Sequence, residues 1–153
     1  HIGWVAAWDI KWTNEAAVKY LIDANIFLES LLEQEKAQST NTLLFKANEM
    51  DFFITDFAYH SIGVTLFHKK KFEKFHRFVL DMIVDAGMLL LSLHQEDTEQ
   101  LISVAQRFSL DFDDAYQYTV AEKYDLHIVS FDTDFDKTAR GRLTPQQVLD
   151  VLK

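Results

Sequence analysis

Short apolar runs alternate along the chain with longer stretches in which apolar side chains recur every three or four positions. The short runs predict β-strands, because a few consecutive or alternating apolar residues suit a sheet. They cover residues 19–22, 52–54, 88–93 and 127–130. The longer stretches have the spacing of one helix face and predict helices. They cover residues 24–34, 41–50, 56–67, 71–86, 95–108, 115–124 and 144–153.

Individual residues indicate where several of these helices begin or end. Ser39 or Thr40 is expected near the N-cap of the second helix, and Asp56 is expected to cap the third. Gly87 follows residues 71–86 and suits the position just past a helix end. Pro145 suits the first turn of the last helix.

Strands that alternate with helices predict an α/β domain, with three α/β/α layers and a mainly parallel sheet of four or five strands. This domain is expected over residues 19–153. Residues 1–18 are expected to be a separate Trp-rich segment, because they hold Trp4, Trp8 and Trp12, spaced by four. If the segment is helical, the tryptophans form one stripe, buried against the domain or against a second copy in a homodimer. The other interpretation is that the segment is not native to the protein.

Composition narrows the class of protein. The chain has 153 residues, of which 48% are hydrophobic, so one core without staples is expected. The absence of Cys excludes disulfides and favours a reducing compartment, the cytoplasm. No apolar run approaches the ~20 residues of a membrane span, so no membrane partner is expected.

The net charge of −9 argues against a protein that grips nucleic acid with its whole surface. Residues 68–77 are the exception, with five Lys or Arg and one Glu. This basic run is interpreted as a solvated helix start, with contact to a polyanion as the alternative.

Three aspartates follow or precede the predicted strands in a way that brings them together. Asp23 ends strand 19–22, Asp132 follows strand 127–130, and Asp114 opens a helix. From Asp114 the helix travels ~16 Å, and the next strand returns about the same distance. Because parallel strands end at one edge of a sheet, Asp23, Asp114 and Asp132 are expected to meet there, where ligands bind in such sheets.

Carboxylates at that spacing repel one another, by ~4 kcal/mol for a pair ~4 Å apart at an effective dielectric near 20. Each acid also has a structural explanation as a helix cap or turn residue. Their shared position favours a cation site, and the lack of Cys and of paired His spacing favours Mg²⁺ or Mn²⁺ over zinc. Asp132–Asp136 begins like a calcium loop, but Lys137 replaces the required Gly and Leu143 the required Glu.

With these residues in view, the chain resembles the PIN domain family from about residue 19 to residue 149. The matching pieces are Tyr-Leu-Ile-Asp23-Ala-Asn25, then Asp113-Asp114-Ala115, then Ile-Val-Ser130-Phe-Asp132-Thr-Asp134. The resemblance implies a Mg²⁺- or Mn²⁺-dependent ribonuclease, and within the family a VapC-like toxin with RNA as substrate and an antitoxin protein as partner.

The resemblance also implies a role for each matching residue. Asp23, Asp114 and Asp132 would be the catalytic metal ligands and Asp134 an auxiliary ligand, with Asn25, Ser61 and Ser130 as polar supports. Lys137, Arg140 and Arg142 would be phosphate contacts. One position departs from the family pattern, since Ser61 stands where the helix after the second strand usually carries an acid. The alternative is therefore a catalytically weakened PIN-like module that binds RNA or protein.

Overall fold

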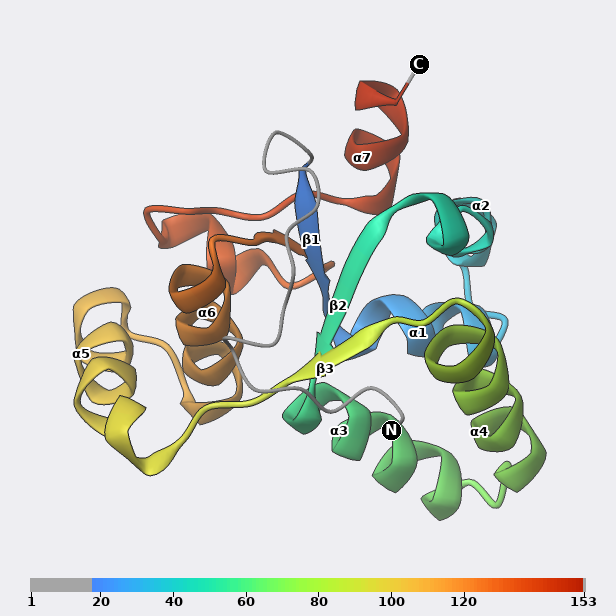
Figure 1. Ribbon diagram of the computed structural model, residues 1–153, viewed down its shortest axis with the longest axis horizontal. Helices are drawn as coiled ribbons and strands as arrows, with labels where there is room; N and C mark the ends of the chain where they lie inside the picture. The colour runs from blue at the N-terminus through green and yellow to red at the C-terminus, as the bar shows by residue number, and fades with distance from the viewer. Residues whose placement is uncertain (1–17, 153) are drawn as a thin grey trace.

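The computed structural model describes residues 18–152 and contains one parallel sheet (Figure 1). Its strands are β1 (Lys19–Ile22), β2 (Asp51–Thr55), β3 (Leu89–Leu91) and β4 (His127–Val129). They lie in the order β3-β2-β1-β4, and every pairing is parallel. An isolated parallel bridge between Val129 and Leu143 extends the sheet beyond β4. The predicted parallel sheet of four or five strands is confirmed.

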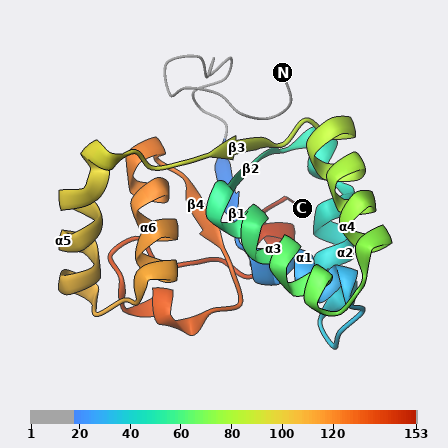
Figure 2. The ribbon, with the colours of Figure 1, turned by 90° about the horizontal axis from the view of Figure 1, so that it is seen from below.

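Seven α-helices surround this sheet in the described part of the chain. They are α1 (Ala24–Leu31), α2 (Ala37–Phe45), α3 (Asp56–His68), α4 (Phe72–Phe78), α5 (Thr98–Phe108), α6 (Phe112–Tyr124) and α7 (Pro145–Val151). Short 3-10 segments cover Ala47–Glu49, Gln95–Asp97 and Thr133–Lys137, and a π-helical segment, Val79–Asp85, continues α4. Figure 2 shows α5 and α6 on one side of the sheet and α1 to α4 on the other. The predicted three-layer arrangement is therefore confirmed.

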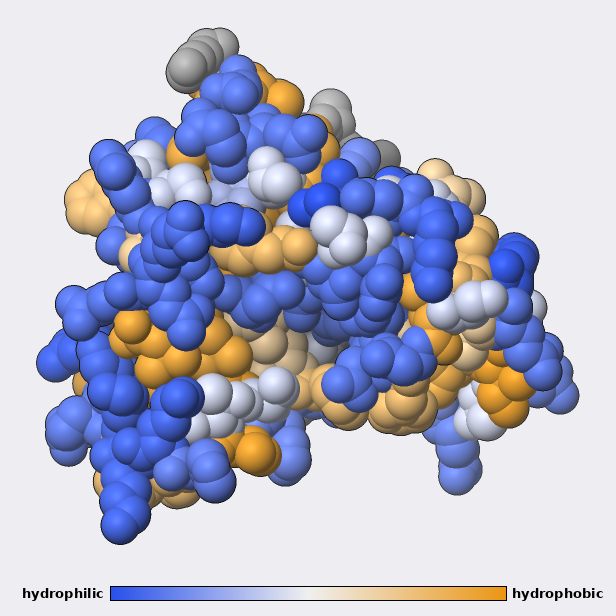
Figure 3. Space-filling view, turned by 180° about the vertical axis from the view of Figure 1, so that it is seen from behind, coloured by the Kyte–Doolittle hydropathy of each residue, from blue (hydrophilic) through white to orange (hydrophobic). Residues whose placement is uncertain are grey.

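Alternating side chains of the strands fill two separate cores. One face of the sheet packs against α1, α2, α3, α4 and α7 through Tyr20, Ile22, Phe52, Ile54, Leu90 and Val129. The other face packs against α5 and α6 through Leu21, Phe53, Leu91 and Ile128. Because both faces are covered, the strands are apolar at successive positions, as buried parallel strands are. The surface opposite the view of Figure 1 is mainly hydrophilic, with apolar residues exposed in separate patches (Figure 3).

Three helix boundaries differ from the sequence predictions for local reasons. The second helix begins at Ala37 rather than residue 41, because Ser39 donates back to Lys36 O instead of capping the next turn (3.2 Å). The third helix is capped by Thr55, whose Oγ1 accepts from Ala58 N (2.9 Å), so Asp56 is the first helical residue. Helix α1 ends at Leu31, before Glu33 takes a left-handed φ of 53°.

Other expected features of the chain hold. Gly87 has a φ of 67° just past the π-helical segment, a conformation that suits glycine. Thr144 caps α7 with Pro145 as its first residue. Trp4, Trp8 and Trp12 lie outside the described residues, so the tryptophan stripe and the boundary at residue 18 stay predictions. Among residues 18–152, no helix has the length and apolar character to cross a bilayer.

Candidate metal centre

The three predicted aspartates line one cavity at the carboxyl edge of the sheet. Asp23 directly follows β1, Asp132 lies just beyond β4, and Asp114 is in the first turn of α6. The Asp23 backbone N–H donates to Val129 O (3.0 Å), which joins the ends of β1 and β4. The cavity measures about 200 Å³, and Asn25 and Ser61 also line it. The predicted convergence of Asp23, Asp114 and Asp132 is present in the fold.

The closest group of carboxylates is not identical to the predicted trio. Oxygens of Asp114, Asp132 and Asp134 all lie within 4.8 Å of one another, so one small cation could contact all three. Asp114 is buried at 8% exposure, whereas Asp134 is exposed. Asp132 caps the following 3-10 turn, because its Oδ1 accepts from Asp134 N (2.8 Å). This cap holds the second and third carboxylates of the group next to each other.

Ser130, directly after β4, connects to Asp23 at the end of β1 through a hydroxyl group that makes all three of its possible hydrogen bonds. Its Oγ donates to Asp23 Oδ2 (2.6 Å) and accepts from Asn25 Nδ2 (3.2 Å) and from the Asp132 backbone N–H (2.9 Å). Asn25 Oδ1 in turn accepts from Phe131 N (3.3 Å). A hydroxyl offers one donor and two acceptor sites, so this network fixes the orientation of the Asp23 carboxylate.

Crowding of the acids changes their protonation. Burial, together with the neighbouring carboxylate of Asp132 and the hydrogen bond shared with it, raises the pKa of Asp114 to about 8. Burial also raises the pKa of Asp23, against the hydrogen bonds that it accepts from Ser130 and Ala24. Near neutral pH the metal-free site therefore holds a proton between Asp114 and Asp132. A bound cation would have to displace that proton.

Comparison with known proteins identifies the family. The sequence matches the PIN domain over residues 20–141. The chain belongs to the PIN domain family. No curated protein matches it closely enough in sequence to count as a relative.

Several solved structures share the PIN fold. PAE2754 from Pyrobaculum aerophilum has 20% identity and a TM-score of 0.64, over 89% of this chain and 97% of that one. A toxin–antitoxin complex from Klebsiella pneumoniae has 21% identity and a TM-score of 0.65, over 83% and 98%. VapBC2 from Rickettsia felis, bound to a DNA fragment from its promoter, has 12% identity and a TM-score of 0.64, over 82% and 97%. At these identities the likeness concerns the fold.

Two neutral polar side chains line the cavity together with the acids. Ser61, on α3, which the resemblance sets at the family's usual acidic position, lines the same cavity as Asp23 and Asp114. Gln117, on α6, also lines it and is buried at 3% exposure. Sequence reasoning missed Gln117. The signal was available, because Gln117 lies three residues after Asp114 and so shares its helix face.

Asp113 is a second cavity-lining residue to which sequence reasoning assigned no role in the site beyond its place in the motif Asp113-Asp114-Ala115. It precedes Asp114 in the first turn of α6 and adds another negative charge near the site, which contributes to the raised pKa of Asp23. The acidic character of the cavity is therefore greater than the predicted trio alone provides.

The three predicted phosphate contacts are each engaged within the protein. Lys137 Nζ donates to Ser109 O (2.9 Å), and Arg142 donates to both Asp136 oxygens (3.0 and 3.2 Å) and to Ser130 O (3.1 Å). Arg140 donates to Asp125 Oδ1 (2.8 Å) and Leu126 O (3.1 Å), just before β4 and thus at the opposite edge of the sheet. Of the three, Arg142 contacts a residue of the acidic site. Phosphate contact by these side chains stays a prediction.

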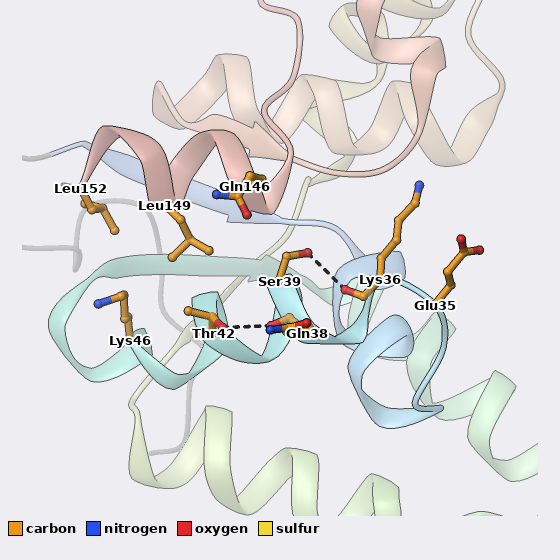
Figure 4. Close-up of a pocket in the computed structure, with 9 residues that line it drawn as sticks. All are labelled: Glu35, Lys36, Gln38, Ser39, Thr42, Lys46, Gln146, Leu149 and Leu152. Atoms are coloured by element: carbon orange, nitrogen blue, oxygen red, sulfur yellow. Dashed lines mark hydrogen bonds between the residues drawn. The ribbon is translucent and has the colours of Figure 1, made fainter.

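A larger cavity, of about 670 Å³, lies between α2 and α7 (Figure 4). Its walls mix charged, polar and apolar side chains, including Lys36, Lys46 and Leu149. Glu35 is the only acid among the described residues that line it, so these residues offer no group of carboxylates that could hold a cation. This cavity is larger than the acidic one, but its lining residues are not suited to a metal ion. The smaller, acidic cavity is therefore the candidate site.

Proposed function

We propose that this PIN domain is a metal-dependent endoribonuclease that hydrolyses RNA phosphodiester bonds. The observation that carries the proposal is the group formed by Asp114, Asp132 and Asp134, whose carboxylate oxygens lie within 4.8 Å of one another. Asp23 lines the same cavity as Asp114 and Asp132 and is held in place by Ser130. Membership of the PIN domain family supports a nuclease. Asp23, Asp114 and Asp132, which meet in the cavity, are also acids to which the resemblance assigned the role of metal ligands.

The residues present fit Mg²⁺ or Mn²⁺. All donors in the group are carboxylate oxygens, which these hard cations prefer, and the group contains no Cys or His. The proton shared by Asp114 and Asp132 supports the same assignment, because it marks a place where positive charge lowers the energy of the site. Asp114, Asp132 and Asp134 would hold the cation, with Asp23 completing the set.

When bound, the cation supplies a Lewis acid that polarises the phosphodiester and lowers the pKa of water. The chain provides the remaining elements. Asp114 releases its proton to solvent before its oxygen can bind. Ser130 keeps Asp23 oriented toward the cavity. The apolar side chains of Ala24, Leu28 and Phe57 also line the cavity and limit the space in which water and the phosphodiester meet. Hydrolysis then adds one water across a P–O bond.

Replacement of Asp23 by Asn tests this function. The substitution keeps the size of the side chain and removes its charge, so Mn²⁺-dependent cleavage of single-stranded RNA should fall at least ~100-fold, as expected for loss of a metal ligand. Asp85→Asn is the matched control. It removes the same charge, and Asp85 is exposed at the end of the π-helical segment. Equal cleavage by Asp23→Asn and the control would exclude this site.

Ser61 favours a second candidate function. With a serine at the usual acidic position, the chain could retain the PIN fold as a catalytically weakened module that binds RNA or protein. Calorimetric titration with Mn²⁺ separates the two functions. Stoichiometric binding that Asp114→Ala abolishes supports the nuclease, whereas absence of binding to the unmodified protein supports the weakened module.

Within the nuclease function, the biological role that we propose is the toxin of a toxin–antitoxin pair. The support is the fold shared with a toxin–antitoxin complex from Klebsiella pneumoniae. An antitoxin that inserts Arg or Lys into the acidic cavity, one per subunit of a homodimer, would suit the charge of −9. The proposed place of this action is the cytoplasm. Expression should arrest growth, and Asp23→Asn should relieve the arrest.

A further inference from the structure

The side-chain amide of Gln117 has a hydrogen bond at its oxygen but none at its nitrogen among the described residues. Its Oε1 accepts from Thr55 Oγ1 (2.6 Å), in a contact that joins α6 to the N-terminus of α3. Thr55 Oγ1 itself accepts from Ala58 N, so its hydroxyl hydrogen is the one directed at Gln117. This fixes the amide with its oxygen toward Thr55. Gln117 Nε2 is buried and has no hydrogen-bond partner among residues 18–152.

An unpaired amide in this environment is costly. Leaving a buried N–H without an acceptor typically destabilises a protein by ~1–3 kcal/mol, so such groups are expected where a ligand supplies the acceptor. The neighbouring carboxylates are directed elsewhere. Asp23 accepts from Ser130 and from Ala24, and Asp114 shares a hydrogen bond with Asp132. Because no residue in the described range 18–152 accepts from Gln117 Nε2, this donor is open to an acceptor that a ligand brings into the cavity.

Ser61 supplies a second donor in the same cavity. It lines the cavity with Gln117, from helix α3, and its hydroxyl makes no hydrogen bond to any described residue. Amide and hydroxyl groups can both donate to an anionic oxygen, whereas the carboxylates that line the same cavity suit a cation. The cavity thus holds two chemically distinct kinds of group.

We propose that Gln117 Nε2 and Ser61 Oγ form a subsite for a non-bridging oxygen of the RNA phosphate. This inference rests on the proposed nuclease function and adds a substrate-binding residue to it. The cation would be held by the acids, and the phosphate by Gln117 and Ser61. In place of the acid that the family pattern has at residue 61, this chain has two neutral donors, so the subsite binds the substrate rather than another cation.

The test uses the full chain loaded with Mg²⁺ and, as a probe, uridine 3′,5′-bisphosphate. In ¹⁵N NMR spectra, the side-chain amide of Gln117 is identified by its absence from Gln117→Met. Addition of the probe should shift this signal, and Gln117→Met should bind the probe about 10- to 100-fold more weakly, as expected for a lost hydrogen bond to a charged oxygen. Gln106→Met, on the exposed surface of α5, is the matched control and should bind like the unmodified protein.

Two further variants separate substrate binding from a structural role. Gln117→Glu keeps an acceptor for Thr55 but loses the N–H donor, so it should also lose probe affinity at about pH 8, where a Mg²⁺-bound site keeps the new carboxylate ionised. Ser61→Ala should lose affinity by several-fold and leaves the Thr55 contact intact. Affinity for Mg²⁺ itself should stay within about twofold in Gln117→Met and Ser61→Ala, because neither residue is a cation ligand.

The outcomes are distinguishable from failure of the nuclease itself. If Mg²⁺ does not bind the unmodified chain, the nuclease function is wrong. If Mg²⁺ binds but the probe binds Gln117→Met, Gln117→Glu and the unmodified chain equally, the phosphate subsite is wrong while the nuclease stands. If the chemical shift of the Gln117 amide does not change when the probe is added, the phosphate subsite is also wrong. That result would indicate that a buried water serves as the acceptor.

Discussion

The Asp114–Asp132 pair holds a proton in the folded, metal-free protein. Because this proton is lost as pH rises, the free energy of unfolding should fall as pH rises. Asp114 has a pKa of about 8 in the folded chain, against ~3.9 for an aspartate in an unfolded chain. Between these values the folded state holds a proton that the unfolded state has lost. Stability therefore decreases with pH throughout that window, and it is fully present only below the pKa of the unfolded chain.

The magnitude follows from the size of the window. One proton difference changes the free energy of unfolding by ~1.4 kcal/mol per pH unit, so about 4 kcal/mol should be lost between about pH 5 and pH 8. That is a large share of the ~5–15 kcal/mol that typically stabilises a domain. Asp114→Asn removes the charge but keeps an amide donor for Asp132, so most of this loss should disappear.

Urea denaturation with EDTA, repeated at several pH values, measures this effect. The unmodified chain and the Asp85→Asn control should lose stability in parallel, while Asp114→Asn should change little. Mg²⁺ at ~100 times its dissociation constant should add ~2.7 kcal/mol to the unmodified chain at about pH 8. Equal pH slopes for Asp114→Asn and the unmodified chain would refute the shared proton, and with it the electrostatic argument for the cation.

Three other substitutions have defined outcomes. Ser130→Ala removes a donor to Asp23 and an acceptor used by two other groups, so the free energy of unfolding should fall by ~1–3 kcal/mol, measured by urea denaturation. Ser61→Glu restores the usual acid of the family pattern and should raise Mn²⁺ affinity about tenfold by calorimetry; unchanged affinity would place residue 61 outside the cation's reach. Gly87→Ala forces a side chain into a left-handed conformation and should lower stability by ~1–2 kcal/mol.

The geometry of the sheet explains why the acidic edge could be predicted from sequence. Helix rise and strand rise are nearly constant, so the path from Asp114 to Asp132 could be followed by counting residues. The burial of both sheet faces was also visible, because the strands carry apolar side chains at successive positions. These features depend on backbone regularity and on the pattern of apolar residues, which a single sequence displays.

Contacts between distant side chains could not be predicted in the same way. Arg140 resembled a phosphate contact because it follows the acids in sequence, but the fold directs it to Asp125 at the other edge of the sheet. Gln117 acquires its significance from Thr55, which lies 62 residues away. The start of α2 depends on Ser39 bonding backward rather than forward, a choice between two local hydrogen bonds of similar energy.

The acidic cavity responds in the same way to any positive charge that enters it. A proton, a divalent cation and a guanidinium from a partner protein all reduce the repulsion between Asp114 and Asp132, and each therefore competes with the others. Cation binding should strengthen as pH rises toward about 8, because the proton then leaves more readily. An inhibitor that uses Arg or Lys would gain affinity over the same range, so its effect would depend on the concentration of the metal. Competition between inhibitor and metal, strongest at high pH, is the behaviour that this arrangement of carboxylates requires.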